Sequence, residues 1–389
     1  MGKRVIVSVI SDLVTDQRVH KVSLTLQEAG HAVLLIGARR KNSGPLLPRS
    51  YPATRIPMLF QKKIFFYGEF NLRLFFRLLF VRGDIFLGND LDCMPAVWLA
   101  GRLRGKPIVY DTHEYYLGMP ELDGRPFVRK VWQRIEAFIF PRLRYIYTIC
   151  DSFCDLYRKD YGKELRAVRN VPYRSFKEMD QELSPEIAAR LPHEMSGGWP
   201  RGKYFLLFQG AGINPERGVE ELVLAMSYLD PARFHLLIIG GGDIFHRIER
   251  MVAGKGLSDR ITLLPKVPFE LLRSVTRLAD LGLSLDKPTN INHIYGLPNK
   301  IFDYLHSGVP VLVSRLVELE KIVNTYQVGG FIDNHDPAHI ASRISEMMKD
   351  PARLETWKRN TENVREELNW EKEGRIVIEI FEQVQRENS

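Results

Sequence analysis

The chain has 389 residues, of which 45% are hydrophobic and 26% are charged, and its formal net charge is +8. These proportions are typical of a folded globular protein and exclude a collagen-like, low-complexity or intrinsically disordered chain. The length favours two domains, because a single hydrophobic core rarely serves so many residues.

Strand-like and helix-like segments alternate through the first half of the chain. Five apolar runs are predicted to be strands: residues 4–10, 32–38, 84–90, 107–113 and 145–149. Helical patterns lie between them at 19–29 and 94–104. Because the first predicted strand begins almost at Met1, no signal peptide is expected. The alternation predicts a parallel sheet covered by helices, in a domain of residues 1–172.

Residues 61–82 combine many aromatic and aliphatic residues with a stripe formed by Arg73 and Arg77. The charges of Glu69, Arg73 and Arg77 argue against a helix that spans a membrane. Two interpretations stay open. The segment is either a core helix with solvated arginines, or a basic amphipathic surface on the inner face of a membrane.

Charge is divided unevenly between the two halves. Residues 1–172 contain 28 Lys and Arg against 16 Asp and Glu, whereas residues 173–389 contain 27 against 31. A basic first half suggests an anionic partner, and membrane phosphates, a lipid diphosphate or nucleic acid all have the required charge. Nucleic-acid binding is not expected, because the basic residues are scattered and form no recognition motif.

Residues 173–202 are polar, contain three prolines and three glycines, and are predicted to be a linker with one short helix. A second alternating series follows in residues 203–370, with predicted strands at 204–212, 234–243, 261–267, 281–286 and 310–314. The two halves therefore predict two doubly wound domains in tandem. A long helix at about 371–389 closes the chain and is expected to pack back on the first domain.

Ligands of doubly wound sheets bind beyond the carboxyl ends of the strands. With two such domains, the expected site is the cleft where these ends face each other. This places the candidate residues in the strand-end loops 11–18, 88–92, 111–118, 210–217, 240–244, 286–299 and 314–318.

The loop after residues 204–212 contains glycines at 210, 212 and 218, which is the wrong spacing for the usual dinucleotide fingerprint. Gly210 and Gly212 allow a close backbone approach, and Arg217 precedes a glycine at the head of a predicted helix. This arrangement suits a phosphate. The alternative is a solvated arginine near a helix start.

The segment GLPNKIFDYLHSGVPVL, residues 296–312, places polar residues at the start of a predicted core helix. Pro298 suits the first helical turn, Lys300 adds a cation, and Asp303 lies one turn further on the same face. A diphosphate could bind Lys300 and the first amides, while Asp303 accepts from ribose hydroxyls. The alternative is a surface ion pair between Lys300 and Asp303.

The same segment resembles the L-P-N-K-x-F-E-Y-x-x-x-G-x-P-V signature of the retaining glycosyltransferases of family 4. Those enzymes have the GT-B fold, in which two doubly wound Rossmann-like domains face a cleft. AGINPERGVEELVLAM resembles the family's phosphate loop and LIIGGGD its following strand and turn. VISDLVTDQRVHKVSLTLQEAGHAVLLIG, DIFLGNDLD and PIVYDTHE resemble its acceptor-side segments.

The resemblance implies a donor site in the second domain. Lys300 and Arg217 would hold the donor diphosphate, with Gly210, Gly212 and the Asn299 amide nearby. Asp303 would bind the ribose. The family needs no metal or cofactor, because basic residues and a helix start stabilise the leaving group.

The resemblance also implies an acceptor side in the first domain. His113 would lie near the transferred sugar and take part in catalysis with Arg217 and Lys300. A plainer interpretation of His113 is a strand-end histidine bonded to Asp111 or Glu114. The candidate acceptor-binding residues are Asp12, Asp16, Arg18 and Glu114. Asp16 could equally cap the helix that follows it.

Three positions differ from the family pattern. The family often has two glutamates with seven residues between them, and here Tyr295 and Asp303 occupy those positions. Ala211 stands where a second arginine is often found, and Lys266 is a candidate replacement. The donor base and sugar are therefore left open.

The predicted function is retaining transfer of a hexose from a nucleoside diphosphate sugar to a glycan or lipid-linked acceptor, in cell-surface polysaccharide synthesis. The alternatives are a sugar-nucleotide epimerase of the same fold and a non-catalytic scaffold. Three cysteines indicate a reducing compartment, so a cytoplasmic protein, peripheral on the inner face of the membrane, is expected.

Overall fold

The computed structural model describes residues 2–174, 185–192 and 202–388 and forms two compact units. The first unit comprises Met1–Asn170, Asn290–Asn292 and Glu371–Ser389, and the second comprises Val171–Thr289 and His293–Trp370. Most of the predicted linker, 173–202, lies outside the described residues. Its described part contains the short helix α6, Pro185–Ala188.

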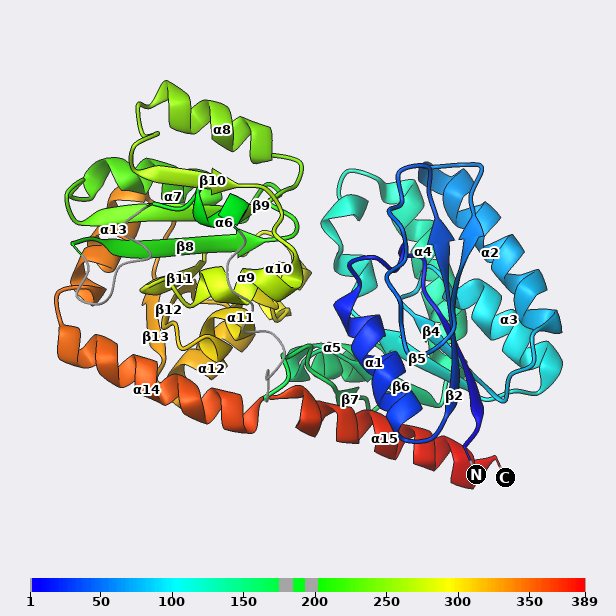
Figure 1. Ribbon diagram of the computed structural model, residues 1–389. Helices are drawn as coiled ribbons and strands as arrows, with labels where there is room; N and C mark the ends of the chain where they lie inside the picture. The colour runs from blue at the N-terminus through cyan, green and yellow to red at the C-terminus, as the bar shows by residue number, and fades with distance from the viewer. Residues whose placement is uncertain (1, 175–184, 193–201, 389) are drawn as a thin grey trace. The chain divides into compact units, whose positions relative to one another are not determined.

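The first unit contains a seven-stranded parallel sheet in the order β3-β2-β1-β4-β5-β6-β7 (Figure 1). The strands are β1 Arg4–Ser8, β2 Ala32–Arg39, β3 Ala53–Pro57, β4 Ile85–Asn89, β5 Ile108–Thr112, β6 Tyr145–Thr148 and β7 Arg166–Ala167. All five predicted strands are confirmed. The sequence did not predict β3, because this edge strand lies between two prolines and is only partly buried.

The helices of the first unit cover this sheet. They are α1 Gln17–Glu28, α2 Lys63–Phe80, α3 Met94–Arg104, α4 Pro126–Ile139, α5 Asp151–Tyr161 and α15 Trp370–Glu387, with 3₁₀ turns at Tyr116–Gly118, Pro120–Leu122 and Phe140–Arg142. Residues 61–82 thus contain a helix whose row of Phe66, Phe70, Leu74 and Leu78 is buried. The interpretation of this segment as a core helix is therefore correct for its inner face.

Helix α15 joins the first unit although it closes the chain. Glu379 of α15 pairs with Arg166 at 2.5 Å, and Glu387 accepts a hydrogen bond from the Tyr145 hydroxyl at 2.6 Å. The ring of Phe381 meets His31 edge-on, with 5.9 Å between the ring centroids. These contacts fix the helix against β6, β7 and the start of β2.

The second unit contains a six-stranded parallel sheet in the order β10-β9-β8-β11-β12-β13. Its strands are β8 Tyr204–Gly210, β9 Phe234–Gly240, β10 Ile261–Leu264, β11 Leu281–Ser284, β12 Val311–Ser314 and β13 Gly329–Ile332. Its further helices are α7 Val219–Ala225, α8 Phe245–Gly254, α9 Phe269–Thr276, α11 Lys300–His306, α12 Val317–Tyr326, α13 Pro337–Met347 and α14 Pro351–Glu367, with a 3₁₀ turn at Met226–Tyr228. Helix α10, Ile291–Tyr295, begins in the short segment Asn290–Asn292 that belongs to the first unit.

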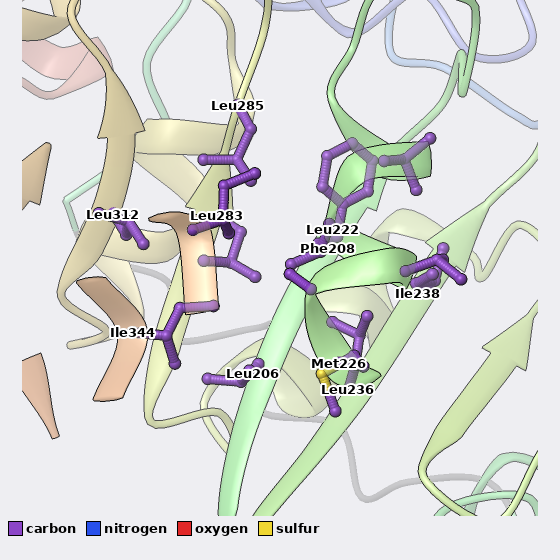
Figure 2. Close-up of a cluster of buried hydrophobic side chains, with 14 of the residues drawn as sticks. Leu206, Phe208, Leu222, Met226, Leu236, Ile238, Leu283, Leu285, Leu312 and Ile344 are labelled. Atoms are coloured by element: carbon purple, nitrogen blue, oxygen red, sulfur yellow. The ribbon is translucent and has the colours of Figure 1, made fainter. Parts of the chain in front are cut away.

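A continuous apolar core lies between this sheet and its helices. Figure 2 shows Leu206 and Phe208 of β8 with side chains from the neighbouring strands and helices: Leu236, Ile238, Leu283, Leu285, Leu312, Leu222, Met226 and Ile344. Strands buried on both faces have near-continuous apolar sequences, which is why these strands could be predicted from the sequence.

Both sheets reverse their strand order at one position. The reversal falls between β1 and β4 in the first sheet and between β8 and β11 in the second. Doubly wound sheets bind ligands beyond the carboxyl ends of the strands at such a reversal. The residues that follow these four strands are therefore the first candidates for a site.

Glu136 on α4 is fully buried, and burial raises the pKa of its carboxyl group to about 7. Its Oε1 atom accepts a hydrogen bond from the Tyr161 hydroxyl at 2.6 Å. A raised carboxyl pKa means that the folded state holds a proton that the unfolded state releases, so stability falls as pH rises from about 4.5 to about 7.

We expect Glu136→Gln to stabilise the protein at pH 8 by about 3 kcal/mol, because the amide keeps the hydrogen bond and removes the buried charge. The gain should disappear near pH 4, below the carboxyl pKa of the unfolded chain. Urea unfolding at the two pH values measures this difference. Glu121→Gln, which changes an exposed carboxylate, is the matched control. An equal change in the free energy of unfolding at both pH values would contradict a raised pKa for Glu136.

Candidate active site

A buried carboxylate at the end of β11 binds two cations in the second unit. Asp286 is 2% exposed, and its Oδ2 atom lies 3.2 Å from Nη1 of Arg217. Its Oδ1 atom lies 3.4 Å from Nζ of Lys300. The residues 217 and 300, far apart in sequence, thus meet at the strand-order reversal between β8 and β11.

The charges in this cluster do not cancel. Burial alone would raise the pKa of Asp286, but Lys300 and Arg217 outweigh burial and lower it, so Asp286 is ionised. Burial lowers the pKa of Lys300, and Arg217 lowers it further, whereas Asp286 raises it. Two cations that share one carboxylate leave a positive excess, which is suited to binding an anion.

Lys300 is the first residue of helix α11, and its Nζ atom also lies over the ring of Phe208, 4.5 Å from the centroid. The helix begins two residues later than predicted, since Pro298 precedes the N-cap residue Asn299. The Pro298 carbonyl still accepts a hydrogen bond from the Ile301 amide at 3.3 Å. The Lys300 side chain is 11% exposed and pairs with the buried Asp286, whereas the alternative was a surface ion pair with Asp303.

Asp303, one turn along α11, faces the end of β8. Its Oδ2 atom accepts a hydrogen bond from Nε2 of Gln209 at 3.1 Å, and Oε1 of Gln209 accepts one from the Thr276 hydroxyl at 2.8 Å. The next residue, Tyr304, accepts a hydrogen bond from the Gln209 amide at 3.0 Å. This network holds the Asp303 carboxylate on the same side of α11 as Lys300.

Two glycine-containing loops pack backbone to backbone beside the cluster. Gly240 has a φ of +150°, and a Cβ atom there would lie 1.9 Å from the Gly210 carbonyl oxygen. Gly218 has a φ of +73°, and a Cβ atom there would lie 2.2 Å from the Leu285 oxygen. Helix α7 starts at Val219, directly after Gly218. Glycine is thus required where these loops approach one another.

The remaining donor-side positions lie around these loops. Gly210 and Gly212 form the turn after β8, and Ala211 between them is exposed. The side chain of Lys266 runs beside Gly241, with its Cε atom 3.2 Å from where a Cβ would lie. Tyr295 is the last residue of α10 and is half-buried. Lys266 is therefore close enough to the loops to remain the candidate replacement for the arginine absent at 211.

His113 lies between two carboxylates in the first unit. Its Nδ1 atom is 3.2 Å from Oδ2 of Asp90, and its Nε2 atom is 3.3 Å from Oδ2 of Asp111. Its backbone amide donates to Oδ1 of Asp90 at 2.8 Å, and Asn89 Oδ1 lies 3.3 Å from Nε2. Asp90 follows β4, so this cluster forms at the strand-order reversal beside β1. The predicted partner Asp111 is found, and the second carboxylate is Asp90.

The two carboxylates keep His113 protonated. Burial would lower its pKa, but Asp90 and Asp111 outweigh burial and raise the pKa to about 9. The stability that this interaction adds is fully present below pH about 6.5 and is lost as pH rises through about 9. An imidazolium at neutral pH supplies a positive charge and cannot accept a proton as a general base.

Arg18 was predicted to bind an acceptor, but the structure places it in the interior. It is 4% exposed, and Nη2 and Nε contact the two oxygens of Asp111 at 2.6 Å and 3.0 Å. Nη1 donates to the Val168 carbonyl at 2.7 Å. A guanidinium group occupied in this way is not open to a ligand. We therefore reassign Arg18 as the residue that positions Asp111, and through it His113.

The other acceptor-side candidates are divided between local structural roles and the surface. Asp16 is the N-cap of α1, because its carboxylate accepts hydrogen bonds from the Val19 amide at 3.2 Å and the Ser11 hydroxyl at 2.8 Å. Asp12 accepts from the Val14 amide at 3.1 Å. Glu114 is exposed, and its carbonyl accepts from Thr112 at 2.6 Å. The hydrogen bonds of Asp16 support its role as the cap of α1. Acceptor binding by Asp16 stays a prediction.

Sequence reasoning missed Asp286, Asp90 and Gln209 as site residues, and it named Asp111 only as a possible partner of His113. Asp90 and Asp286 lie in strand-end loops that were candidates, whereas Gln209 is the penultimate residue of β8 and precedes the candidate loop 210–217. The available signal was an acidic or amide side chain at the end of an apolar run. An acidic residue at a strand end does not by itself indicate which cation it binds, because that cation can be far away in the sequence.

Two family descriptions match the chain in succession. "Glycosyltransferase Family 4" matches residues 16–171, and "Glycosyl transferases group 1" matches residues 193–364. The first match lies almost wholly in the first unit, and the second lies in the second unit.

Two curated proteins are similar over parts of the chain. A D-inositol 3-phosphate glycosyltransferase of Thermomonospora curvata is 27% identical over 195 residues, which are 47% of this chain and 44% of that protein. A putative colanic acid biosynthesis glycosyl transferase, WcaI of Escherichia coli, is 23% identical over 68% of this chain and 67% of its own length. The match thus spans less than half the length of the first relative.

A solved structure shares the whole fold. HepE of Anabaena, crystallised with UDP and glucose, superposes with a TM-score of 0.75 at 11% identity, covering 98% of this chain and 100% of that one. The predicted architecture of two doubly wound domains of the GT-B type is confirmed.

Proposed function

Because this chain belongs to glycosyltransferase family 4 and has the GT-B fold, we propose that it transfers a hexose from a nucleoside diphosphate sugar to a glycan or lipid-linked acceptor, with retention of configuration. The observation that carries this proposal is the cluster of Arg217, Lys300 and Asp286 beside Asp303. A diphosphate fits the two cations, and a ribose fits the neighbouring carboxylate.

The donor chemistry follows from the charges in this cluster. The bond from the anomeric carbon to the diphosphate oxygen breaks, and negative charge develops on the leaving group. Arg217 and Lys300 stabilise that charge, so no metal is required. The acceptor oxygen bonds to the anomeric carbon on the same face, and the leaving phosphate takes the acceptor's proton.

In this mechanism His113 acts as a cation and not as a base. Its ring is held by Asp90 and Asp111, which orient it and keep it charged at neutral pH. Arg18 contributes by holding Asp111.

The acceptor belongs to cell-surface polysaccharide synthesis in this proposal. Support comes from the similarity to a protein described as acting in colanic acid biosynthesis. A lipid-linked acceptor would bring the enzyme to the cytoplasmic face of a membrane as a peripheral protein. Among the described residues, no helix has the length and apolar character needed to cross a membrane.

A thermal-shift panel of UDP, GDP, ADP and their sugars tests the donor. A ligand that binds only the folded state adds about 2.7 kcal/mol at one hundred times its dissociation constant, so one nucleotide should raise Tm clearly. No increase in Tm with any of these nucleotides would contradict the proposal.

Incubation with the nucleotide sugar alone distinguishes the transferase from an epimerase, since an epimerase would convert the donor without an acceptor. A scaffold would neither transfer nor hydrolyse any donor.

We expect Asp286→Asn to destabilise the protein by up to about 3 kcal/mol without ligand, because the partly buried Lys300 and Arg217 lose their shared carboxylate. Nucleoside diphosphate should then raise Tm more in the variant than in wild type, since the diphosphate supplies the missing negative charge. Asp333→Asn, which removes an exposed carboxylate paired with Arg315, is the control. If nucleoside diphosphate raised Tm equally in the variant and in wild type, the diphosphate would not bind these two cations.

A further inference from the structure

Exposed apolar side chains are concentrated on one part of the first unit. Of the fourteen large hydrophobic side chains that are exposed among the described residues, thirteen lie in the first unit, and only Tyr228 lies in the second. Seven of them fall within 22 consecutive residues. These seven form what we call the α2 surface: Leu59, Phe60, Ile64, Phe65, Leu72, Phe76 and Phe80.

Helix α2 is apolar on its outer side as well as its inner side. The buried row of Phe66, Phe70, Leu74 and Leu78 faces the core. At 100° per residue, Leu72 and Phe76 point away from that row, and they are 59% and 52% exposed. A helix beside water normally carries polar residues there. The outer row therefore indicates a partner that is itself apolar.

The neighbouring helix extends the α2 surface. Arg104 of α3 donates to the carbonyls of Leu78 and Val81 at 2.6 Å each, which fixes the end of α3 to the end of α2. Leu99 and Leu103, one turn apart on α3, are 43% and 65% exposed. The apolar area thus spans two helices that are held in a fixed arrangement.

Exposed cations lie at both ends of the α2 surface. Lys62, Lys63, Arg77 and Arg82 are exposed, whereas the one carboxylate of this segment, Glu69, accepts from two loop amides and pairs with Arg73 at 2.8 Å. Apolar side chains bordered by lysine and arginine match a bilayer whose headgroups are anionic. A second copy of this chain fits less well, because two such surfaces would oppose like charges.

We propose that the α2 surface inserts its apolar side chains into the interface of a bilayer containing anionic lipid, with Lys62, Lys63, Arg77 and Arg82 on the headgroups. The inference extends the proposed function by naming the surface that brings the enzyme to a lipid-linked acceptor. It does not depend on the donor chemistry, because lipid binding is measured without nucleotide sugar.

Co-sedimentation with vesicles tests the proposal. Wild type should pellet with vesicles of phosphatidylcholine and phosphatidylglycerol, and much less with phosphatidylcholine alone. Leu72→Gln with Phe76→Gln should lower partitioning at least about tenfold on the anionic vesicles, because two half-exposed side chains lose their lipid contact. Tyr228→Gln, an equally exposed aromatic residue in the second unit, should leave partitioning unchanged.

A second variant tests the electrostatic contribution of the basic residues separately from the insertion of apolar side chains. Arg77→Gln with Arg82→Gln should lower binding to anionic vesicles on the order of thirtyfold, as expected from about 1 kcal/mol for each charge. Lys255→Gln with Lys349→Gln makes the same charge change in the second unit and should have no effect. Three results would overturn the proposal: wild type that stays in the supernatant, binding that both α2 variants retain, or a stable dimer that the Leu72 and Phe76 substitutions dissociate.

Discussion

Lys300→Ala is expected to lower the rate of sugar transfer by a factor of about 10² to 10³, the effect of removing one group that stabilises developing charge. Lys300 lies 3.4 Å from Asp286 and is largely buried, so water cannot replace its charge fully. The affinity for nucleoside diphosphate should fall about ten- to a hundredfold, because a hydrogen bond to a charged group contributes about 1.5–3 kcal/mol. Transfer rates at saturating donor and calorimetric titration measure the two effects.

The control for this variant is Lys349→Ala, an exposed lysine of the same unit. It should keep both the rate and the affinity of wild type. If Lys300→Ala also bound nucleoside diphosphate as tightly as wild type, the donor assignment would be wrong even with a reduced rate. Circular dichroism of the variant shows whether it is folded, so that a loss of affinity caused by unfolding is not mistaken for a loss of the binding contact.

Arg18→Met is expected to destabilise the protein by about 3–5 kcal/mol, because it leaves the fully buried Asp111 without its main cation. Burial alone would raise the pKa of Asp111, and Arg18 and His113 lower it below the usual value. A lowered carboxyl pKa gives stability that is present above the unfolded pKa and is lost as pH falls through the folded pKa. The loss in Arg18→Met should therefore be larger at pH 7 than at pH 4.

Urea unfolding of Arg18→Met, of Asp111→Asn and of the double variant measures the interaction. The double variant should be more stable than the sum of the two single effects predicts, since neither residue is then left as an unpaired buried charge. Arg129→Met, which removes an exposed arginine, should cost little. Additive effects of the two single substitutions would show that Arg18 does not position Asp111.

The fold was largely predictable because its central strands are buried on both faces. β8 and β9 have apolar sequences without alternation, and the glycines that follow them mark their ends. β3 was missed for the opposite reason, since an edge strand of five residues with prolines at its borders has no strong pattern. Helix α7 starts directly after Gly218. Position 218 requires glycine because the Leu285 carbonyl packs against it, and this contact cannot be recognised from the sequence.

The candidate site was predictable only for residues whose role is local. Lys300 and Asp303 lie on one helix, so their common face follows from helix geometry alone. Asp286 joins Lys300 and Arg217 across three loops, and only the packing of β8 beside β11 brings them together. Arg18 looked like a polar residue at a helix start, but its partner is 93 positions away. The assigned roles of these residues in binding and catalysis stay predictions.

A crystal structure with the nucleoside diphosphate that gives the largest thermal shift would test the central claim most directly. The account predicts that phosphate oxygens lie about 3 Å from Nζ of Lys300 and the guanidinium of Arg217, with the ribose hydroxyls donating to Asp303. A diphosphate bound elsewhere in the chain, with Lys300 and Arg217 in contact only with Asp286, would contradict it.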